Sequence, residues 1–299
     1  MPGTLTVMTL TGIHVPLITP FRADGAVAID AIAQLAGDAL DAGAAGLVAF
    51  GTTAEVAALS VGERTEILDV CARICRERDA ALTVGAGGSD TAATLRALTE
   101  LAGHTAALVT VPSFTRPGEA GVLAHFAYLA AHSPVPLVIY HIPYRTGQQL
   151  SAATVRELGS LPGIIGVKYA VGGIDAQTVE LFADLPADFD VLIGDDVVVG
   201  PAFAMGASGG ILASANVATA PFVDLYQAWQ TGDLARARDL GGKLGRISAA
   251  LFAEPNPTVL KGVLHATGRI PTANVRLPLV PASQDSVDAA LKLLADLGS

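Results

Sequence analysis

One of the four lysines in this 299-residue chain lies where a charged side chain is costly. Lys168 closes the apolar run of residues 164–167, which has the character of a buried strand. Burial disfavours the ammonium form of a lysine, and the neutral amine is a nucleophile that can form a Schiff base with a carbonyl compound. The alternative is a strand-end lysine whose ammonium group reaches water or pairs with a carboxylate.

The other three lysines provide a contrast. Lys243, Lys261 and Lys292 fall in stretches with helical periodicity, and we expect them on helix surfaces. Among the four, Lys168 is therefore the candidate nucleophile.

Further polar residues follow other apolar runs. Thr52 and Thr53 follow one such run. Tyr140 lies near the end of another, and Arg145 comes in the loop after it. A phenol and a hydroxyl can move protons beside a Schiff-base lysine, and an arginine fork can hold a carboxylate. Taken singly, these are ordinarily a core tyrosine, a surface arginine and helix-capping threonines; together, at strand ends, they favour a catalytic function.

Short apolar runs alternate with longer helical patterns along most of the chain. The runs are apolar on both faces, as buried parallel strands are, and span residues 12–18, 46–50, 82–86, 106–111, 137–142, 164–168, 191–193 and 209–213. The helical patterns span residues 30–42, 60 onward, 91–102, 118–131, 151–158, 175–185, 197–205 and 221–230. We expect Asp30 to cap the first helix, and Ser60 with Glu63 to form a capping box at the second.

Eight strands, each followed by a helix, predict an α/β fold of the (β/α)8 TIM-barrel type. An open, doubly wound sheet is the alternative, but no GxGxxG motif follows the first run. After residue 230 only helical patterns follow, at residues 233–252, 258–266 and 285–297. We therefore predict a barrel of residues 1–230 and a C-terminal helical region of residues 231–299 packed on it. In such barrels the chemistry lies at the carboxyl ends of the strands.

The composition restricts the partners and the compartment. The net charge of −10 and pI near 4.9 argue against nucleic acid or an anionic membrane surface as a partner. The N-terminal ten residues lack the pattern of a signal peptide, and no apolar run approaches the ~18 residues of a membrane span. Cys71 and Cys75 form no CxxC motif and suggest no disulfide framework. We expect a cytoplasmic protein.

Four motifs of the chain occur together in one known family. Residues 51–55 (GTTAE) resemble its GTTGE, and residues 140–147 (YHIPYRTG) resemble YNVPxRTG. Residues 166–168 (GVK) match GxK, and residues 254–257 match EPNP. On these motifs the chain resembles the dihydrodipicolinate synthase / N-acetylneuraminate lyase family of class I, pyruvate-type Schiff-base lyases. The resemblance covers residues 12 to about 281.

The resemblance implies a reaction and the residues that catalyse it. Lys168 would form the Schiff base with pyruvate or a pyruvate-derived 2-keto acid, and an aldehyde would be the second substrate. Tyr140 would be the general acid and base, and Thr52 would relay protons. No cofactor and no metal would take part.

The resemblance also implies binding residues and an assembly. Thr53, with Thr52, would help to hold the keto-acid carboxylate, and Arg145 would bind the carboxylate of the second substrate. Gly194 and Ile211 match positions that line the substrate site. The chain would be a homo-oligomer, either a dimer or a tetramer.

One departure from the family pattern leaves the substrate open. Phe114 stands where the synthases have a tyrosine that completes a proton relay from a neighbouring subunit. The nearest named activity is 4-hydroxy-tetrahydrodipicolinate (dihydrodipicolinate) synthase. An aldolase or dehydratase of 2-keto-3-deoxy sugar acids uses the same imine without needing the full relay. A catalytically silent keto-acid-binding relative is the alternative of another class.

Overall fold

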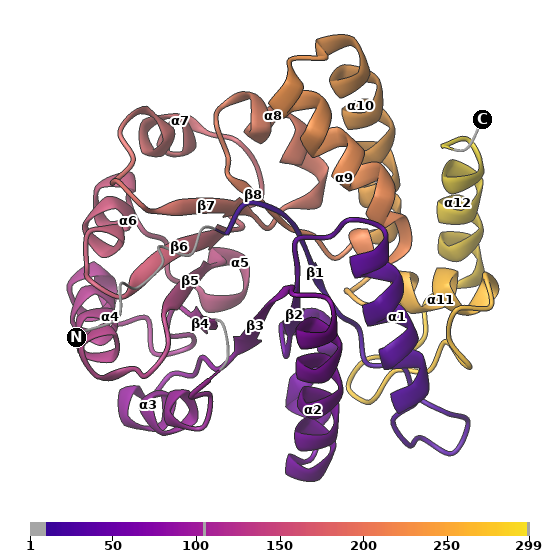
Figure 1. The fold of residues 1–299 in the computed structure, drawn as a ribbon, viewed down its shortest axis with the longest axis horizontal. Coiled ribbons are helices and arrows are strands. Elements are labelled where there is room, and N and C mark those ends of the chain that lie inside the picture. The colour runs from indigo at the N-terminus through magenta and orange to yellow at the C-terminus, as the bar shows by residue number, and fades with distance from the viewer. Residues whose placement is uncertain (1–9, 104–105, 298–299) are drawn as a thin grey trace.

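The eight expected strands form a closed parallel barrel in the computed structural model, which describes residues 10–103 and 106–297 (Figure 1). The strands pair in sequence order, and β8 closes the barrel against β1. Each strand begins within one residue of its expected start: β1 (Gly12–Pro16), β2 (Gly46–Ala49), β3 (Ala81–Gly85), β4 (Ala106–Thr110), β5 (Leu137–His141), β6 (Ile164–Tyr169), β7 (Asp190–Ile193) and β8 (Gly209–Ile211). The predicted TIM barrel is confirmed.

The strands are apolar on both faces because they bury both. One face fills the barrel interior, with a cluster formed by Leu10, Val48, Ala106, Leu108, Val138, Tyr140, Ala170, Leu192 and Ile211. The other face packs against the surrounding helices in a second, larger cluster. The interior is thus a packed core, and a cavity near the reacting groups must lie towards the carboxyl ends of the strands.

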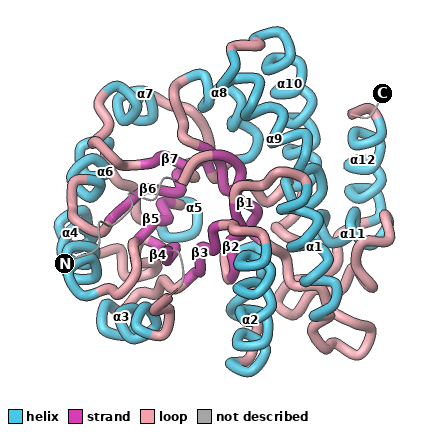
Figure 2. The backbone as a smooth tube through the Cα atoms, viewed as in Figure 1, coloured by secondary structure: helices cyan, strands magenta, loops and turns pink. Residues whose placement is uncertain are grey.

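A ring of helices surrounds the strands, as Figure 2 shows in cyan around magenta. The helices that follow the strands are α1 (Ile29–Asp41), α2 (Val61–Glu77), α3 (Thr91–Thr99), α4 (Gly118–His132), α6 (Ala152–Gly159), α7 (Ala176–Ala183), α8 (Val199–Ala204) and α9 (Ala215–Thr231). Short turns precede some of them: η1 (Thr52–Ala54), η2 (Val56–Ala58), α5 (Pro143–Thr146) and η3 (Asp196–Val198). The capping box of Ser60 and Glu63 at α2 is confirmed.

Two expectations about helix starts were wrong. The first helix begins at Ile29, with Ala28 at the N-cap, so Asp30 lies in its first turn, where a carboxylate still complements the helix dipole. The last helix of the barrel begins at Ala215 instead of Pro221. Ala218 (φ −130°, ψ 52°) is not helical, so Pro221 lies in the first turn of the segment after this kink, where a proline is tolerated.

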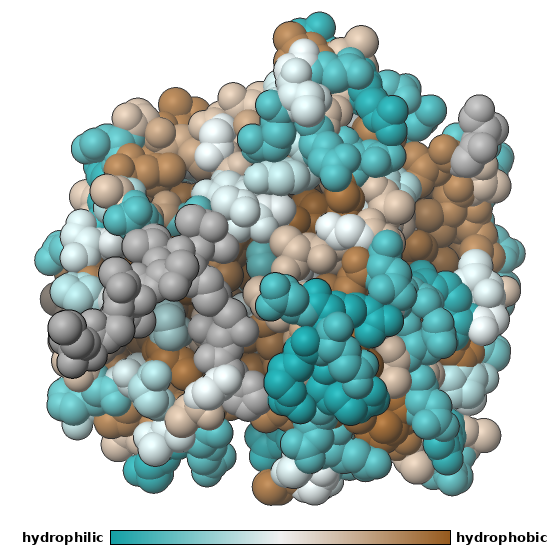
Figure 3. Space-filling model, viewed as in Figure 1, coloured by the Kyte–Doolittle hydropathy of each residue, from teal (hydrophilic) through white to brown (hydrophobic). Residues whose placement is uncertain are grey.

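Three helices follow the barrel: α10 (Leu234–Leu251), α11 (Thr258–Ala266) and α12 (Gln284–Ala295). They contact one another and the barrel, where α10 packs against α8, η3 and α9. Figure 3 shows a hydrophobic area over α12. The turn at Gly232 separates α9 from α10; the division into residues 1–230 and 231–299 stays a prediction.

Within the part of the chain that the structure describes, no helix is long and apolar enough to cross a membrane. The expected absence of a signal peptide concerns residues 1–10, and of these only Leu10 is among the described residues.

Candidate active site

Lys168 and Tyr140 lie side by side in the barrel interior. They are direct neighbours in the register of β5 and β6, and each side chain is buried. The Lys168 Nζ atom lies 4.5 Å from the centroid of the Tyr140 ring. The amine and the phenol can therefore act on one bound molecule, as the sequence predicts.

Gly194, which follows β7, makes room for the lysine. A Cβ atom at this position would lie 2.8 Å from Lys168 Cε and 3.0 Å from Lys168 Cγ, so a larger residue would displace the side chain. Ile211 ends β8, is buried, and belongs to the same interior cluster as Tyr140. The structure thus brings Lys168, Tyr140, Gly194 and Ile211 together.

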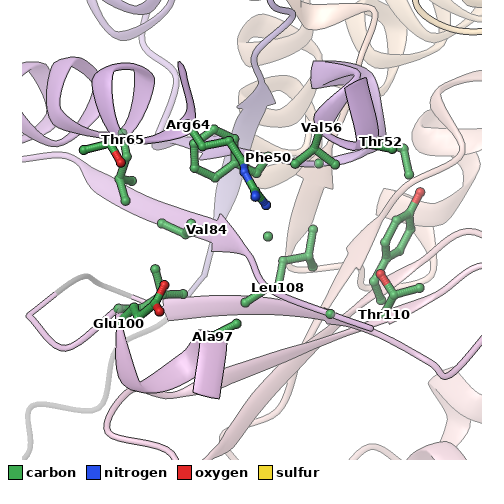
Figure 4. A pocket seen from close by; sticks show the side chains of 18 of the residues that line it. Phe50, Thr52, Val56, Arg64, Thr65, Val84, Ala97, Glu100, Leu108 and Thr110 are labelled. Carbon is green, nitrogen blue, oxygen red and sulfur yellow. The ribbon is translucent and has the colours of Figure 1, made fainter. Parts of the chain in front are cut away.

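A cavity of about 840 Å³ leads away from the tyrosine. Thr52 and Thr110 line one end of it, whereas Glu100 of the α3 region lies towards the other (Figure 4). Tyr140, the register neighbour of Thr110, also belongs to the lining. In the close-up the guanidinium of Arg64 points into this space. Lys168 is not part of the lining, so Tyr140 is the residue that connects the cavity with the amine.

Two carboxyl groups after β7 act on Lys168 from a distance. Burial raises the pKa of Asp196 to about 6, although a hydrogen bond from the Ser214 backbone and the charge of Lys168 oppose this. Asp196 Oδ2 accepts the Ser214 backbone N–H at 2.6 Å, and Oδ1 has no hydrogen-bond partner among the described residues. Burial also raises the pKa of Asp195, whose Oδ2 accepts the Gly172 N–H at 2.7 Å. Neither carboxylate forms a direct ion pair with the amine.

The two threonines after β2 face different neighbours. Thr52, the first residue of η1, is half-buried and lines the cavity. Thr53 is buried, and its Oγ1 accepts a hydrogen bond from Asn256 Nδ2 at 3.0 Å. The Thr53 hydroxyl is therefore engaged by the C-terminal region. Its role in holding a substrate carboxylate stays a prediction.

Arg145 stands apart from the buried group. It lies in α5, directly after β5, and its side chain is exposed to solvent. Its neighbour Tyr144 and the loop residue Phe114 are 91% and 95% exposed. The binding role of Arg145 stays a prediction.

The described residues contain no group of three His, Cys, Asp or Glu side chains that could hold a metal ion. His141, which follows Tyr140, is fully buried on the outer side of the strand beside Tyr169, and burial lowers its pKa to about 4. The expected independence from metals and cofactors stays a prediction.

The surface position expected for Lys261 was wrong. This lysine is fully buried, and its Nζ atom lies 2.7 Å from Glu55 Oε1 in an ion pair whose partners are both inaccessible to solvent. The helical periodicity of α11 was read correctly, but α11 is buried on nearly all sides. A lysine is hidden there because a carboxylate from the GTTAE segment neutralises it.

Sequence reasoning also missed several residues around the site. Thr110 lines the cavity and is the register neighbour of Tyr140 on β4, a position that the strand pattern alone could have indicated. The remaining missed residues come from the C-terminal region: Asn256, Lys261 and Arg276. Their hydrogen bonds to Thr53 and Glu55 span more than 200 positions of sequence. The EPNP motif is the one sequence signal that indicates this region.

Comparison with known proteins agrees with this geometry. Residues 9–297 match the Dihydrodipicolinate synthetase family. The chain is 36% identical to a 4-hydroxy-tetrahydrodipicolinate synthase of Neisseria meningitidis serogroup B over 293 residues, which covers 96% of this chain and 100% of the relative. It is 33% identical over 289 residues to 4-hydroxy-tetrahydrodipicolinate synthase 2 of Clostridium acetobutylicum, with coverage of 96% and 100%.

Solved structures give the same result. The dihydrodipicolinate synthase of Thermotoga maritima superposes with a TM-score of 0.92 at 29% identity, covering 97% of this chain and 99% of that one. A monomeric dihydrodipicolinate synthase variant gives 0.91 at 29% identity, with 98% of both chains covered. The chain therefore belongs to the dihydrodipicolinate synthetase family, and it is an enzyme of the class I, Schiff-base-forming lyase type.

Proposed function

We propose that this enzyme condenses pyruvate with an aldehyde through an imine on Lys168, as a 4-hydroxy-tetrahydrodipicolinate synthase. The observation that carries the proposal is the environment of the Lys168 amine. It is buried next to the Tyr140 phenol, and no carboxylate of the described residues lies within 4 Å of it. Such an amine is free to add to a carbonyl carbon.

The reaction follows from the chemistry of a primary amine. The neutral amine adds to C2 of pyruvate, and loss of water from the carbinolamine gives a protonated imine. Loss of a proton from C3 then gives an enamine, since the imine takes up the electron pair. The enamine carbon attacks the aldehyde carbon, and the aldehyde oxygen takes up a proton. Hydrolysis of the new imine releases the product and restores the amine.

The neighbouring residues fit the proton transfers that these steps need. Tyr140 is close enough to Lys168 to donate a proton to the leaving hydroxyl group and later to the aldehyde oxygen. Thr52 lines the cavity with Tyr140 and can pass the proton on. Arg145, exposed at the carboxyl end of the barrel, is available for the carboxylate of an incoming aldehyde.

Exchange of the pyruvate C3 protons tests the proposal without knowledge of the aldehyde. In deuterium oxide, NMR should show loss of the C3–H signal with the wild-type enzyme but not with Lys168→Ala. A panel of carboxylate-bearing aldehydes should then give pyruvate consumption with at least one member. Exchange that is equally fast in both proteins would contradict the role of Lys168.

A second candidate within the same chemistry is an aldolase or dehydratase of 2-keto-3-deoxy sugar acids. It is favoured by Phe114, which has no hydroxyl to complete a tyrosine relay and is 95% exposed in the single chain. Turnover of 2-keto-3-deoxy sugar acids that exceeds condensation would favour this candidate. Exchange at C3 without turnover of any substrate would instead favour a silent keto-acid-binding relative.

The assembly and the compartment are also part of the proposal. We propose a homo-oligomer, either a dimer or a tetramer, because Phe114 and Tyr144 expose large rings that a second copy could cover. A cytoplasmic location fits the two free, buried thiols of Cys71 and Cys75. Light scattering of the purified enzyme tests the assembly, and a single-chain mass would contradict it.

A further inference from the structure

The loop that carries Thr52 has little local structure to hold it. It consists of η1, a single 3-10 turn without a side-chain cap, and of Glu55, which adopts a left-handed backbone conformation (φ 52°). This conformation is unfavourable for a residue with a Cβ atom and persists only where surrounding contacts enforce it. The contacts that place Thr52 must therefore come from elsewhere in the molecule.

Residues of the C-terminal region supply most of these contacts, and Thr19 Oγ1 adds a hydrogen bond to the Ala54 carbonyl at 2.7 Å. Glu55 Oε1 accepts a hydrogen bond from Lys261 Nζ at 2.7 Å, and Glu55 Oε2 accepts one from the Arg276 backbone N–H at 2.8 Å. Asn256 Nδ2 donates to Thr53 Oγ1. Figure 1 shows this region, in yellow, passing α1 towards α2. The segment from Thr53 to Glu55 is thus fixed from the side that faces away from the cavity.

The pair of Glu55 and Lys261 lies in an apolar setting. Its two side chains are 1% and 0% exposed. Lys261 Nζ lies 4.1 Å from the centroid of the Phe21 ring, and Arg276 Cζ lies 4.4 Å from the same ring. Burying two charges is costly, and apolar residues of similar volume often give an equally stable fold. Stability therefore does not explain why this ion pair is present, whereas a fixed orientation of the loop does.

We propose that Lys261 is a positioning residue for the reaction: through Glu55 it fixes the loop that presents Thr52 to the Tyr140 end of the cavity. Asn256, through Thr53, fixes the same loop two residues earlier. The inference rests on the proposed function, in which Thr52 relays a proton. A misplacement of about 1 Å can lower turnover about 10²-fold, so loosening this loop should reduce kcat.

Two variants test the inference, and a third serves as a matched control. Lys261→Met removes the charge and the hydrogen bond to Glu55, and Asn256→Ala removes the hydrogen bond to Thr53. Arg269→Met is the control, because Arg269 also joins the C-terminal region to the barrel, by donating to the Asn216 carbonyl at 2.7 Å, but does not touch the loop.

The readouts are kcat, KM for pyruvate and the yield of the borohydride-reduced pyruvate adduct on Lys168. We expect kcat to fall about 10- to 100-fold in Lys261→Met and about 10-fold in Asn256→Ala. The adduct should still form in both after long incubation, since the Lys168 amine is intact and a slower proton transfer delays the imine without preventing it. Arg269→Met should keep its kcat per folded molecule.

Lys261→Met leaves Glu55 buried and unpaired, so a second variant guards against loss of folding. Glu55→Gln/Lys261→Met contains no unpaired charge and should show the same fall in kcat. Full turnover in folded double-variant and Asn256→Ala enzymes would overturn the inference. So would a fall in kcat that only follows the folded fraction, as in the control. A wild-type enzyme that forms no imine contradicts the proposed function itself, and is distinguishable from these results.

Discussion

The molecule buries two lysines, and they differ in what surrounds the amine. Lys168 is 4% exposed and Lys261 is 0% exposed, and each amine lies over an aromatic ring, at 4.5 Å from Tyr140 and 4.1 Å from Phe21. The Lys261 amine is 2.7 Å from a carboxylate of Glu55, whereas no described carboxylate lies within 4 Å of the Lys168 amine. Burial lowers the pKa of Lys261 to about 8, and Glu55 opposes that effect.

The difference shows that burial alone does not identify a nucleophile. A buried lysine that is held by a carboxylate has a fixed geometry and remains a structural cation. A buried lysine beside a phenol, with room made by Gly194, can approach a substrate. Under the proposed function, the barrel uses Lys168 for chemistry, whereas Lys261 joins the barrel to the helices after it.

The largest expected effect comes from exchanging each lysine for methionine. Lys168→Met should lower kcat by several orders of magnitude, as loss of a covalent nucleophile does. It should leave the free energy of unfolding within about 1 kcal/mol, since no described carboxylate lies within 4 Å of the Lys168 amine and the charges of Asp195 and Asp196 act on it only from a distance. Lys261→Met should instead cost about 3–5 kcal/mol of stability. Urea unfolding measures the stability, and steady-state kinetics measure kcat. Lys243→Met, at a half-exposed lysine, is the control. The opposite pattern would refute the comparison.

Tyr140→Phe tests whether the phenol makes Lys168 reactive. We expect kcat to fall about 10²–10⁴-fold, the range for a positioned acid or base, while the imine with pyruvate still forms in part. Tyr169→Phe is the matched control, since this tyrosine lies on the outer side of β6, beside His141. An unchanged kcat in Tyr140→Phe would remove the phenol from the proton transfers.

His141 is a buried base that has no hydrogen-bond partner among the described residues. Its pKa in the folded chain is about 4, below the ordinary 6.5, so the unfolded chain takes up a proton first as the pH falls. The stability that His141 contributes is complete above pH 6.5 and is lost between pH 6.5 and 4. The loss amounts to about 3 kcal/mol.

Urea unfolding between pH 7 and 4 measures this loss. His141→Gln should show a shallower dependence of stability on pH than the wild type, by about one proton. Burial also lowers the pKa of His14 to about 4, and His14 contributes equally to the pH dependence of stability in both proteins. The exposed His132→Gln should behave as the wild type does. Identical slopes in wild type and His141→Gln would show that His141 has the same pKa in the folded and unfolded chains, which contradicts the prediction.

The smallest effect should come from Arg145, which lies outside the buried group. Arg145→Ala should raise KM for the aldehyde about 10-fold, because at this exposed position we expect the lower end of the about 1.5–3 kcal/mol of a charge-assisted hydrogen bond. KM for pyruvate and the imine yield should stay unchanged. Initial rates with each substrate varied in turn give both constants. An effect confined to pyruvate would mean that Arg145 serves the first substrate instead.

The sequence predicts the parts of this account that depend on local pattern. Apolar runs give the start of each strand to within one residue, and the spacing of Ser60 and Glu63 gives the capping box. Strand ends bring Lys168, Tyr140 and Gly194 together because all parallel strands of a barrel end at one side. These features need only the immediate neighbours of each residue and the topology of the fold.

The parts that escaped prediction depend on partners far away in the chain. Lys261 has the periodicity of a surface helix, and only the carboxylate of Glu55, 206 positions earlier, explains its burial. The contact of Asn256 with Thr53 spans 203 positions. The sequence around Pro221 predicts a helix start at the proline, because prolines are common there. It does not predict the helical residues from Ala215 onward, since the kink at Ala218 depends on packing and not on the local sequence.

Reduction of the enzyme with borohydride in the presence of pyruvate tests the central claim most directly. Mass spectrometry of the peptides then compares Lys168 and Lys261 within one sample, so the second buried lysine is the internal control. We predict a reduced pyruvate adduct on Lys168 and none on Lys261. An adduct on Lys261, or no adduct on either lysine, would contradict the account.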